Sequence, residues 1–361
     1  MRIAVIGTGL IGGSVGLAAV AAGHEVVGVD ADSEALARAR ERGAVTSVAT
    51  GPAEAVADVD LVVVAVPVGT VADTVIAVLD AGAPVVTDVG SVKGSVVGAV
   101  GAARPESADR YVGGHPMAGS EQGGIDAARS DLFIGATWVL TPTGATTDAA
   151  YATTRTFVRD LGAEAVAVTP AEHDALVALV SHVPQLAAST LMDVASTQEA
   201  RHRALLRLAA GGFRDMTRIA ASHPEIWLDI LAANRDAVLA GLDAYVEALG
   251  AARQWIAAGD ADALAGLLAR ARSARRNLPV GAEAAVELAE LRVPIPDRTG
   301  VLAEVTTLAG RLGVNIADVE IAHSIEGSAG VLVLVVPAAD AGALAAELRE
   351  HGYAPGRAEL A

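Results

Sequence analysis

Apolar and polar positions divide the chain into three blocks. Up to about residue 168, short apolar runs such as residues 2–6, 61–67 and 84–89 alternate with alanine-rich stretches of helical character. Continuous apolar runs of this length are typical of strands that are buried on both faces of a parallel sheet. Strands that alternate with helices predict an α/β domain with a Rossmann-type, doubly wound parallel sheet over residues 1–168.

The second block has the spacing of helices, and the third returns to strands. From residue 169 to about 280, apolar residues recur three and four positions apart, as at Leu176, Leu179 and Val180. This spacing predicts an all-α domain. Residues 290–361 contain short strands and two helices in the order βαββαβ, which predicts a ferredoxin-like domain.

Composition and charge narrow the classes of function. The 361 residues are 52% hydrophobic but only 3% aromatic, so the cores must be built from small aliphatic side chains. A formal net charge of −17 repels phosphate backbones and argues against a nucleic-acid partner. The absence of cysteine excludes disulfides and thiolate metal ligands, and the sequence contains no other metal-ligand cluster.

The sequence also predicts a cytoplasmic protein without a membrane segment. Its first residues pass directly into a strand pattern, unlike those of a signal peptide. Uninterrupted apolar runs stay below the roughly 18 residues that a membrane-spanning helix needs. The lack of cysteine fits a reducing compartment.

A glycine motif lies between the first predicted strand and the first predicted helix. The sequence Gly-Thr-Gly-Leu-Ile-Gly over residues 7–12 permits a tight turn, a close approach to a pyrophosphate and close helix packing. The second strand ends at Asp30, whose carboxylate can bind a ribose 2′-hydroxyl and would repel a 2′-phosphate. These features favour NAD over NADP as the cofactor. We predict a cofactor site that contains Gly7, Thr8, Gly9, Leu10, Ile11, Gly12, Asp30, Val66 and Pro67.

Residues 113–121 contain the strongest candidate for proton transfer. Glycines and a proline surround His115, which predicts a tight loop after a strand at residues 110–112. Ser91 also follows a predicted strand, and ligands bind outside the carboxyl ends of parallel strands. We therefore expect Ser91 and His115 near the nicotinamide, with His115 able to exchange a proton near neutral pH. The alternative is a surface loop whose histidine has no role.

Two polar segments interrupt the helical block. One contains His182 and Gln185, and the other, residues 211–219, has two glycines followed by charged residues that include Arg218. Arg218 could bind an anion in a cleft or lie on a solvated helix face, and His182 could equally be a hydrogen-bonded core histidine. We predict that three further histidines face solvent, namely His173, His202 and His351.

Five motifs in order resemble those of the prephenate dehydrogenases of tyrosine biosynthesis, in the form with a C-terminal ACT domain. The motifs are residues 7–14, 88–94, 113–121, 181–184 and 212–220. Trp227 also lies where this family has an active-site tryptophan, and residues 297–302 with 313–316 resemble the ligand-binding segments of ACT domains. The resemblance covers the whole chain.

The resemblance implies oxidative decarboxylation of prephenate to 4-hydroxyphenylpyruvate. His115 would take the proton of the ring hydroxyl, Ser91 would hydrogen-bond to it, and Arg218 would bind a substrate carboxylate. The rest of the implied substrate site consists of His182, Gln185, Ser120, Glu121, Asp215 and Trp227. The family also implies a homodimer through the helical domain.

The C-terminal domain is implied to bind tyrosine or, as second choice, phenylalanine. The implied regulatory residues are Asp297, Gly300, Val301, Leu302, Asn315 and Ile316. Two positions depart from the family pattern. Gln185 stands where the family often has a second histidine, and Thr299 stands where many ACT domains have proline.

Three other functions stay open at the level of sequence. The substrate could be arogenate, alone or beside prephenate, because neutral Gln185 tolerates either a keto or an amino group. A dehydrogenase of β-hydroxy acids with the same domain order would be expected to use a helix lysine, but the sequence has only Lys93, in a glycine-rich loop. A non-catalytic, NAD-responsive sensor is disfavoured by the set of Ser91, His115 and Arg218.

Overall fold

The computed structural model describes residues 1–119, 123–199, 209–276, 288–296, 298–316, 318–323 and 329–359. The chain forms two compact units, Met1–Leu268 and Ala269–Ala361. Predictions for Ser120, Glu121, His202 and Asp297 lie outside the described residues.

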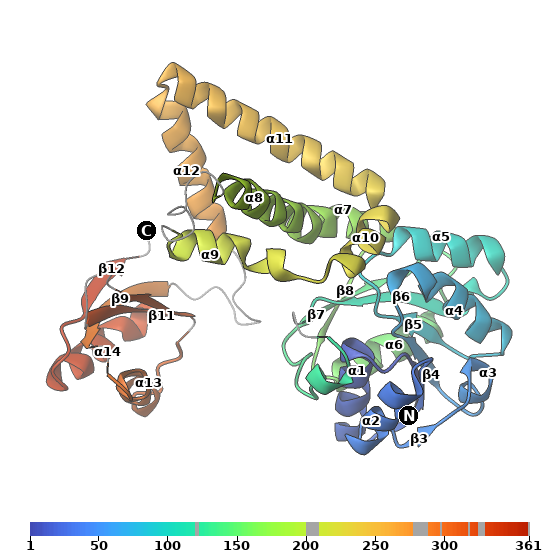
Figure 1. Cartoon of the computed structure of the whole chain (residues 1–361). Coiled ribbons are helices and arrows are strands. Elements are labelled where there is room, and N and C mark those ends of the chain that lie inside the picture. Colours follow the sequence, from blue (N-terminus) through green and yellow to red (C-terminus); the bar gives the residue numbers. More distant parts are fainter. Residues whose placement is uncertain are drawn as a thin grey trace. The chain divides into compact units, whose positions relative to one another are not determined.

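An eight-stranded sheet forms the centre of the Rossmann-type part of the first unit (Figure 1), in the order β3-β2-β1-β4-β5-β6-β7-β8. The strands are β1 (Arg2–Ile6), β2 (Glu25–Val29), β3 (Ser47–Val48), β4 (Leu61–Val64), β5 (Val86–Asp88), β6 (Tyr111–Pro116), β7 (Thr137–Thr141) and β8 (Glu164–Ala167). The first six strands are parallel in the Rossmann order, which confirms the predicted fold class. The sheet is not parallel throughout, because β7 runs antiparallel to β6. Strand β8 is parallel to β7 and therefore also runs opposite to the first six strands.

Helices cover both faces of this sheet. Helices α1 (Leu10–Ala21), α2 (Ser33–Glu41) and α6 (Asp148–Asp160) contribute to one core, and α3 (Pro52–Ala55), α4 (Val68–Asp80) and α5 (Gly94–Ala103) contribute to the other. Because successive strand residues point to opposite faces, Ile3 and Val5 enter the first core while Ala4 and Ile6 enter the second. The continuous apolar runs therefore reflect burial on both faces.

The remainder of the first unit is helical, as predicted. It contains α7 (Pro170–Val177), a π-helical turn (Ala178–His182), α8 (Val183–Glu199), α9 (Gly211–Thr217), a 3₁₀ turn (Arg218–Ala221), α10 (Pro224–Ala233), α11 (Arg235–Ala258) and α12 (Ala261–Arg276), which ends beyond the unit boundary. Thr169 begins α7 through a capping box with Glu172. Helix α10 packs on α4, and α7 packs on α5, so both helices reach the Rossmann-type part.

Among the residues that the structure describes, one helical stretch, Pro170–Thr197, is long and apolar enough to cross a membrane by length and composition alone. The sequence did not predict such a stretch. Core helices of globular proteins meet the same criterion, and this one buries His173, His182 and Gln185 within the first unit. Of its most apolar 18-residue window, 33% is buried in the single chain.

The second unit has the predicted ferredoxin-like fold. Its elements are β9 (Leu288–Pro296), α13 (Val301–Arg311), β10 (Asp318–His323), β11 (Ala329–Pro337), α14 (Ala338–Glu350) and β12 (Gly356–Glu359). The strands form an antiparallel sheet in the order β10-β11-β9-β12. Aliphatic residues of both helices, such as Val305 and Leu344, pack with Leu291 and Leu332 of the sheet into one core.

Candidate active site

The glycine turn between β1 and α1 is suited to a dinucleotide. Gly7 has a φ of +96°, and a Cβ there would collide with the carbonyl of Ala65. A Cβ at Gly12 would collide with the carbonyl of Gly7, whereas a Cβ at Gly9 would meet nothing within 4 Å. The turn is therefore tight on the protein side and open at Gly9, where a pyrophosphate must approach the backbone at the start of α1. These residues fit NAD.

The carboxylate of Asp30 is fixed beside this turn. Its Oδ2 accepts hydrogen bonds from the backbone nitrogen of Thr8 at 2.6 Å and from Thr8 Oγ1 at 2.9 Å. Its Oδ1 accepts a hydrogen bond from the backbone nitrogen of Asp32 at 2.9 Å. The predicted ribose-binding group is thus held at the end of β2, next to the glycine motif.

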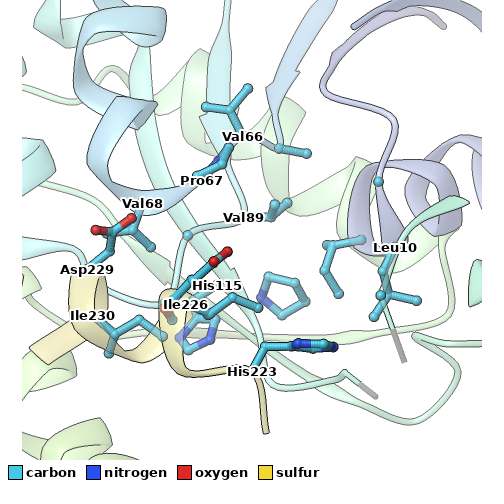
Figure 2. Close-up of a pocket in the computed structure, with 18 of the residues that line it drawn as sticks. Leu10, Val66, Pro67, Val68, Val89, His115, His223, Ile226, Asp229 and Ile230 are labelled. Carbon is cyan, nitrogen blue, oxygen red and sulfur yellow. The ribbon is translucent and has the colours of Figure 1, made fainter. Parts of the chain in front are cut away.

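A cavity of about 750 Å³ opens at the carboxyl end of the sheet. Its walls come from the glycine turn, from the residues that follow β4 and β5, from β6 and from α10 (Figure 2). The predicted site residues that line it are Gly9, Leu10, Ile11, Val66, Pro67, Ser91 and His115. The structure therefore brings the predicted cofactor turn and the predicted proton acceptor to one cavity.

Helix α10 supplies a wall that the sequence did not predict. His223, Ile226 and Asp229 line the cavity opposite the Rossmann-type residues (Figure 2), and Glu225 of the same helix also lines it. The signal was Pro224, which marks the first turn of a helix, but helical spacing alone does not say what that helix faces. Two additional carboxylates therefore border the cavity.

The predicted loop at His115 is wrong, because His115 lies on strand β6. It pairs with Val139 of the antiparallel strand β7. The preceding glycines are required by close packing and not by a turn. A Cβ at Gly114 would collide with the carbonyl of Asp88 and crowd Trp138, so only glycine allows β6 to lie this close to its neighbours.

A fully buried ion pair between Lys93 and Asp88 supports β6. Lys93 pairs with Asp88 and also donates a hydrogen bond to the carbonyl of Gly114 at 2.8 Å. Asp88 accepts hydrogen bonds from the Gly114 nitrogen at 3.1 Å and from the Tyr111 hydroxyl at 2.8 Å. Both polar groups of Gly114 are thereby fixed next to His115. Burial lowers the pKa of Lys93, while Asp88 opposes that shift.

His115 forms a hydrogen-bonded chain with two residues of α7. His115 Nδ1 lies 2.9 Å from His173 Nε2, and His173 Nδ1 lies 2.8 Å from Asp174 Oδ1. Burial, followed by repulsion from Lys93, His173 and His182, holds the pKa of His115 well below its usual value. At neutral pH His115 is therefore a neutral imidazole that can accept a proton.

The prediction that His173 faces solvent is wrong. Its side chain is only 1% exposed, because α7 packs on α5 with this face inward. Helical spacing showed apolar positions of α7 but did not indicate that its polar face would meet another helix. His351, by contrast, is exposed as predicted.

The other predicted substrate residues that the structure describes do not line this cavity. His182 is a buried, hydrogen-bonded histidine: its Nδ1 accepts from Asn234 Nδ2 at 3.3 Å, and its ring lies 6.0 Å from that of Trp227. Burial lowers the pKa of His182, and Asp174 opposes that shift. Gln185 is also buried. Asp215 and Arg218 are exposed on α9 and on the 3₁₀ turn that leads toward α10.

The Rossmann strand order, the open glycine turn and the cavity that contains His115 define an NAD-dependent dehydrogenase with a helical second domain. Two family models match it: prephenate dehydrogenase, nucleotide-binding domain, over residues 15–167, and prephenate dehydrogenase, dimerization domain, over residues 169–270. The chain belongs to the prephenate dehydrogenase family.

Individual relatives agree with this assignment. The chain is 32% identical to the prephenate dehydrogenase of Bacillus subtilis over 91% of its own length and 90% of that protein. The structure of a prephenate dehydrogenase from A. aeolicus in complex with hydroxyphenyl propionate and NAD+ is similar, with a TM-score of 0.70, 27% identity, and coverage of 77% of this chain and 98% of that one. Synechocystis arogenate dehydrogenase has a TM-score of 0.69 and 29% identity, covering 77% and 100%.

Proposed function

We propose that this protein oxidises and decarboxylates prephenate to 4-hydroxyphenylpyruvate, with NAD as the hydride acceptor. The observation that carries the proposal is His115, a neutral imidazole in the same cavity as the glycine turn. Oxidation of a ring hydroxyl needs a base for the proton close to an acceptor for the hydride. The family and its relatives support the same reaction.

The chemistry divides between the substrate and the protein. His115 takes the proton of the ring hydroxyl as the carbonyl forms, and bound NAD supplies the chemistry of hydride acceptance. The ring is then a vinylogous β-keto acid. The C–C bond to its carboxylate breaks with release of CO2, the electron pair of that bond completes the aromatic ring, and the ring carbonyl oxygen takes up a proton to become the hydroxyl of the product. Since aromatisation drives the reaction, the protein must mainly position the ring and hold the proton acceptor neutral.

Substrate binding is assigned to residues of both domains. Ser91 lines the cavity with His115 and can hydrogen-bond to the substrate hydroxyl. Arg218 lies in the 3₁₀ turn just before α10 and can bind a carboxylate through two hydrogen bonds. The other proposed substrate residues, by family resemblance, are His182, Gln185, Ser120, Glu121, Asp215 and Trp227.

A reduction assay tests the proposal. The protein is mixed with NAD and prephenate, and the absorbance of reduced cofactor and the release of CO2 are followed together. We expect equal amounts of reduced cofactor and CO2. The His115→Asn protein, purified in the same way, serves as the control. Reduction without CO2, or no reduction with any cyclohexadienyl substrate, contradicts the proposed reaction.

Arogenate is the second candidate substrate. It carries an ammonium group where prephenate carries a keto group, and the carboxylates of Glu225 and Asp229 line the cavity. An ammonium group is attracted by such carboxylates, which give no favourable contact to a keto group. The ratio of kcat/KM for the two substrates, measured before and after Glu225→Gln and Asp229→Asn, decides between them.

The protein is further proposed to be a cytoplasmic homodimer that assembles through its helical domain. The match to a dimerization domain supports this, as do large apolar side chains that are exposed on a single chain. The most exposed ones on the helices are Leu228, Ile256, Leu268, Val180, Val246, Ile226 and Val194. Light scattering at micromolar concentration tests the dimer, and a monomer at that concentration contradicts it.

The C-terminal unit is proposed to act as an ACT domain that binds tyrosine, or phenylalanine as second choice. The proposed binding residues are Asp297, Gly300, Val301, Leu302, Asn315 and Ile316. Asn315 is exposed in the turn between α13 and β10, and its amide can both donate to and accept from an amino acid. Calorimetric titration of each amino acid into the full chain tests this, with Asn315→Ala as the matched variant. Unchanged binding by that variant would place the ligand elsewhere, and no binding would leave the unit a role in assembly.

A further inference from the structure

We infer that Asp174, acting through His173, keeps the proton of neutral His115 on Nδ1, so that Nε2 is free to accept a proton in the cavity. His173 and Asp174 are thus positioning residues for the reaction. The inference rests on the proposed function for its catalytic meaning. The hydrogen-bond chain itself does not depend on the identity of the substrate.

The direction of the chain is set at Asp174. Its Oδ1 accepts from the Lys93 backbone nitrogen at 2.8 Å and its Oδ2 from that of Gly94 at 2.7 Å, at the start of α5. Partial burial acts to raise the pKa of Asp174, but hydrogen bonds from His173, Lys93 and Gly94 outweigh it and leave the pKa below its usual value. Asp174 is therefore ionised at neutral pH, and an ionised carboxylate only accepts hydrogen bonds.

The protons of the two imidazoles follow from that acceptor. Because Asp174 accepts, His173 Nδ1 must donate across the 2.8 Å contact. A neutral imidazole has one N–H, so His173 Nε2 is an acceptor. It lies 2.9 Å from His115 Nδ1, which must then be the donor. The second nitrogen of His115, Nε2, is left without a proton.

The opposite arrangement needs a cationic His173. Its Nε2 would then donate to His115, and the proton of neutral His115 would move to Nε2, where it blocks proton acceptance. Lys93, a buried cation, and His182, in the π-helical turn before α8, lie near His115 and oppose a positive charge on it. Asp174 is the carboxylate in direct hydrogen-bond contact with His173.

The expected catalytic value of this control is large. In Ser-His-Asp triads, the change of the aspartate to asparagine leaves the geometry intact but costs about 10⁴-fold in kcat through the wrong tautomer. In this protein a carboxylate also fixes the tautomer of the base, but a second imidazole, that of His173, lies between the two. Preorganisation of the tautomer spares the enzyme a rearrangement in every turnover.

Nitrogen NMR of the histidine rings tests the inference without any substrate. Protein labelled with ¹⁵N-histidine is measured at about pH 8, above the usual histidine pKa of about 6.5, and spectra of His115→Asn and His173→Gln assign the two rings. We expect a protonated Nδ1 and an unprotonated Nε2 in both His115 and His173. A proton on Nε2 of His115 in the wild-type protein overturns the inference. Failure of the proposed substrate leaves this result unchanged, so the two failures are distinguishable.

Two substitutions at one position separate positioning from folding. His173→Phe keeps a buried ring but removes the acceptor for His115, whereas His173→Gln offers an amide oxygen in its place. We expect His173→Phe to lower kcat by roughly 10²-fold and His173→Gln to recover most of that loss, with KM and NAD affinity nearly unchanged in both. Equal losses in the two variants, or a loss confined to KM, overturn the inference. If the phenylalanine variant does not fold, the wild-type spectrum decides alone.

Discussion

The two walls of the cavity differ in how firmly their polar groups are held. The wall that contains His115 is supported by Asp88, Lys93 and, on α7, His173. These three residues are almost completely buried, and each makes at least one hydrogen bond to a fixed partner. On the α10 wall, His223, Glu225, Ile226 and Asp229 are exposed, and Ile230 is the buried residue of that helix.

The difference assigns distinct tasks to the walls. A buried polar group destabilises the fold unless its hydrogen-bond partners are in place. The network around His115 is therefore restricted to one geometry. Exposed side chains on α10 can adjust their rotamers when a ligand arrives. The proton acceptor is therefore prepared before the substrate enters, while the exposed side chains of α10 that border the cavity are ordered by it.

The largest expected effect is the loss of kcat when the reactive group of the prepared wall, His115, is replaced. His115→Asn should lower kcat by roughly 10²- to 10⁴-fold, the usual contribution of general acid–base catalysis, because asparagine cannot take up the substrate proton. NAD affinity, measured by fluorescence quenching, should stay unchanged, since the glycine turn is untouched. Turnover close to that of the wild-type protein would refute the assignment of His115.

Loss of the buried ion pair should damage stability rather than one kinetic step. Lys93→Met leaves the buried Asp88 without its cation, and we expect the free energy of unfolding to fall by about 3–5 kcal/mol. The double variant with Asp88→Asn should recover part of this loss. Glu225→Gln, on the exposed wall, should change stability by no more than about 0.5 kcal/mol. Equal melting shifts for the Lys93 and Glu225 variants would remove the contrast between the walls.

Arg218 tests the substrate-binding role proposed for the exposed turn before α10. Arg218→Ala should raise KM for prephenate by roughly 10- to 100-fold, as expected for loss of hydrogen bonds to a charged group, and should leave NAD affinity unchanged. Arg218→Lys should restore little, because an ammonium group cannot make the paired contact of a guanidinium. An unchanged KM in the alanine variant would return Arg218 to a solvated helix face.

Asp30 offers a test of cofactor choice on the prepared wall. The double variant Asp30→Ser with Ala31→Arg should increase kcat/KM for NADP relative to NAD by roughly tenfold, because repulsion of the 2′-phosphate is replaced by attraction. Asp30→Asn keeps the size of the side chain and serves as control for its hydrogen bonds to Thr8. A wild-type protein that already prefers NADP would show that Asp30 does not select the cofactor.

The smallest expected effect is the pH dependence near neutrality. Since burial and neighbouring charges lower the pKa of His115 well below about 6.5, kcat/KM should stay level as pH falls from 8 through 6.5 and drop only below that. The unfolded chain binds this proton at higher pH than the folded chain does, so stability from this group is full above about pH 6.5 and declines as pH falls toward the folded pKa. His115→Asn should remove that decline. Half-maximal activity at pH 6.5 or above would contradict the lowered pKa.

Local rules predicted the cofactor side of the site better than its catalytic side. The glycine motif, the carboxylate of Asp30 and the strand order depend on turn geometry and on apolar runs, both of which can be read along the chain. His115 was misplaced because glycine was interpreted as a turn signal, whereas Gly114 serves the close packing of β6. The burial of His173 depends on which helix packs against α7, and no periodicity within α7 contains that information.

Chemical labelling of the single lysine can report how often the structure around the active site opens. Lys93 is the only lysine of the sequence, and its side chain is fully buried beneath β6. An amine-reactive reagent can therefore acylate a lysine of this protein only after the contacts around Lys93 have opened. The rate at which the added mass appears on the peptide that contains Lys93 measures how often this part of the fold opens locally. No probe has to be engineered, and each active-site variant can be compared with the wild type by mass spectrometry.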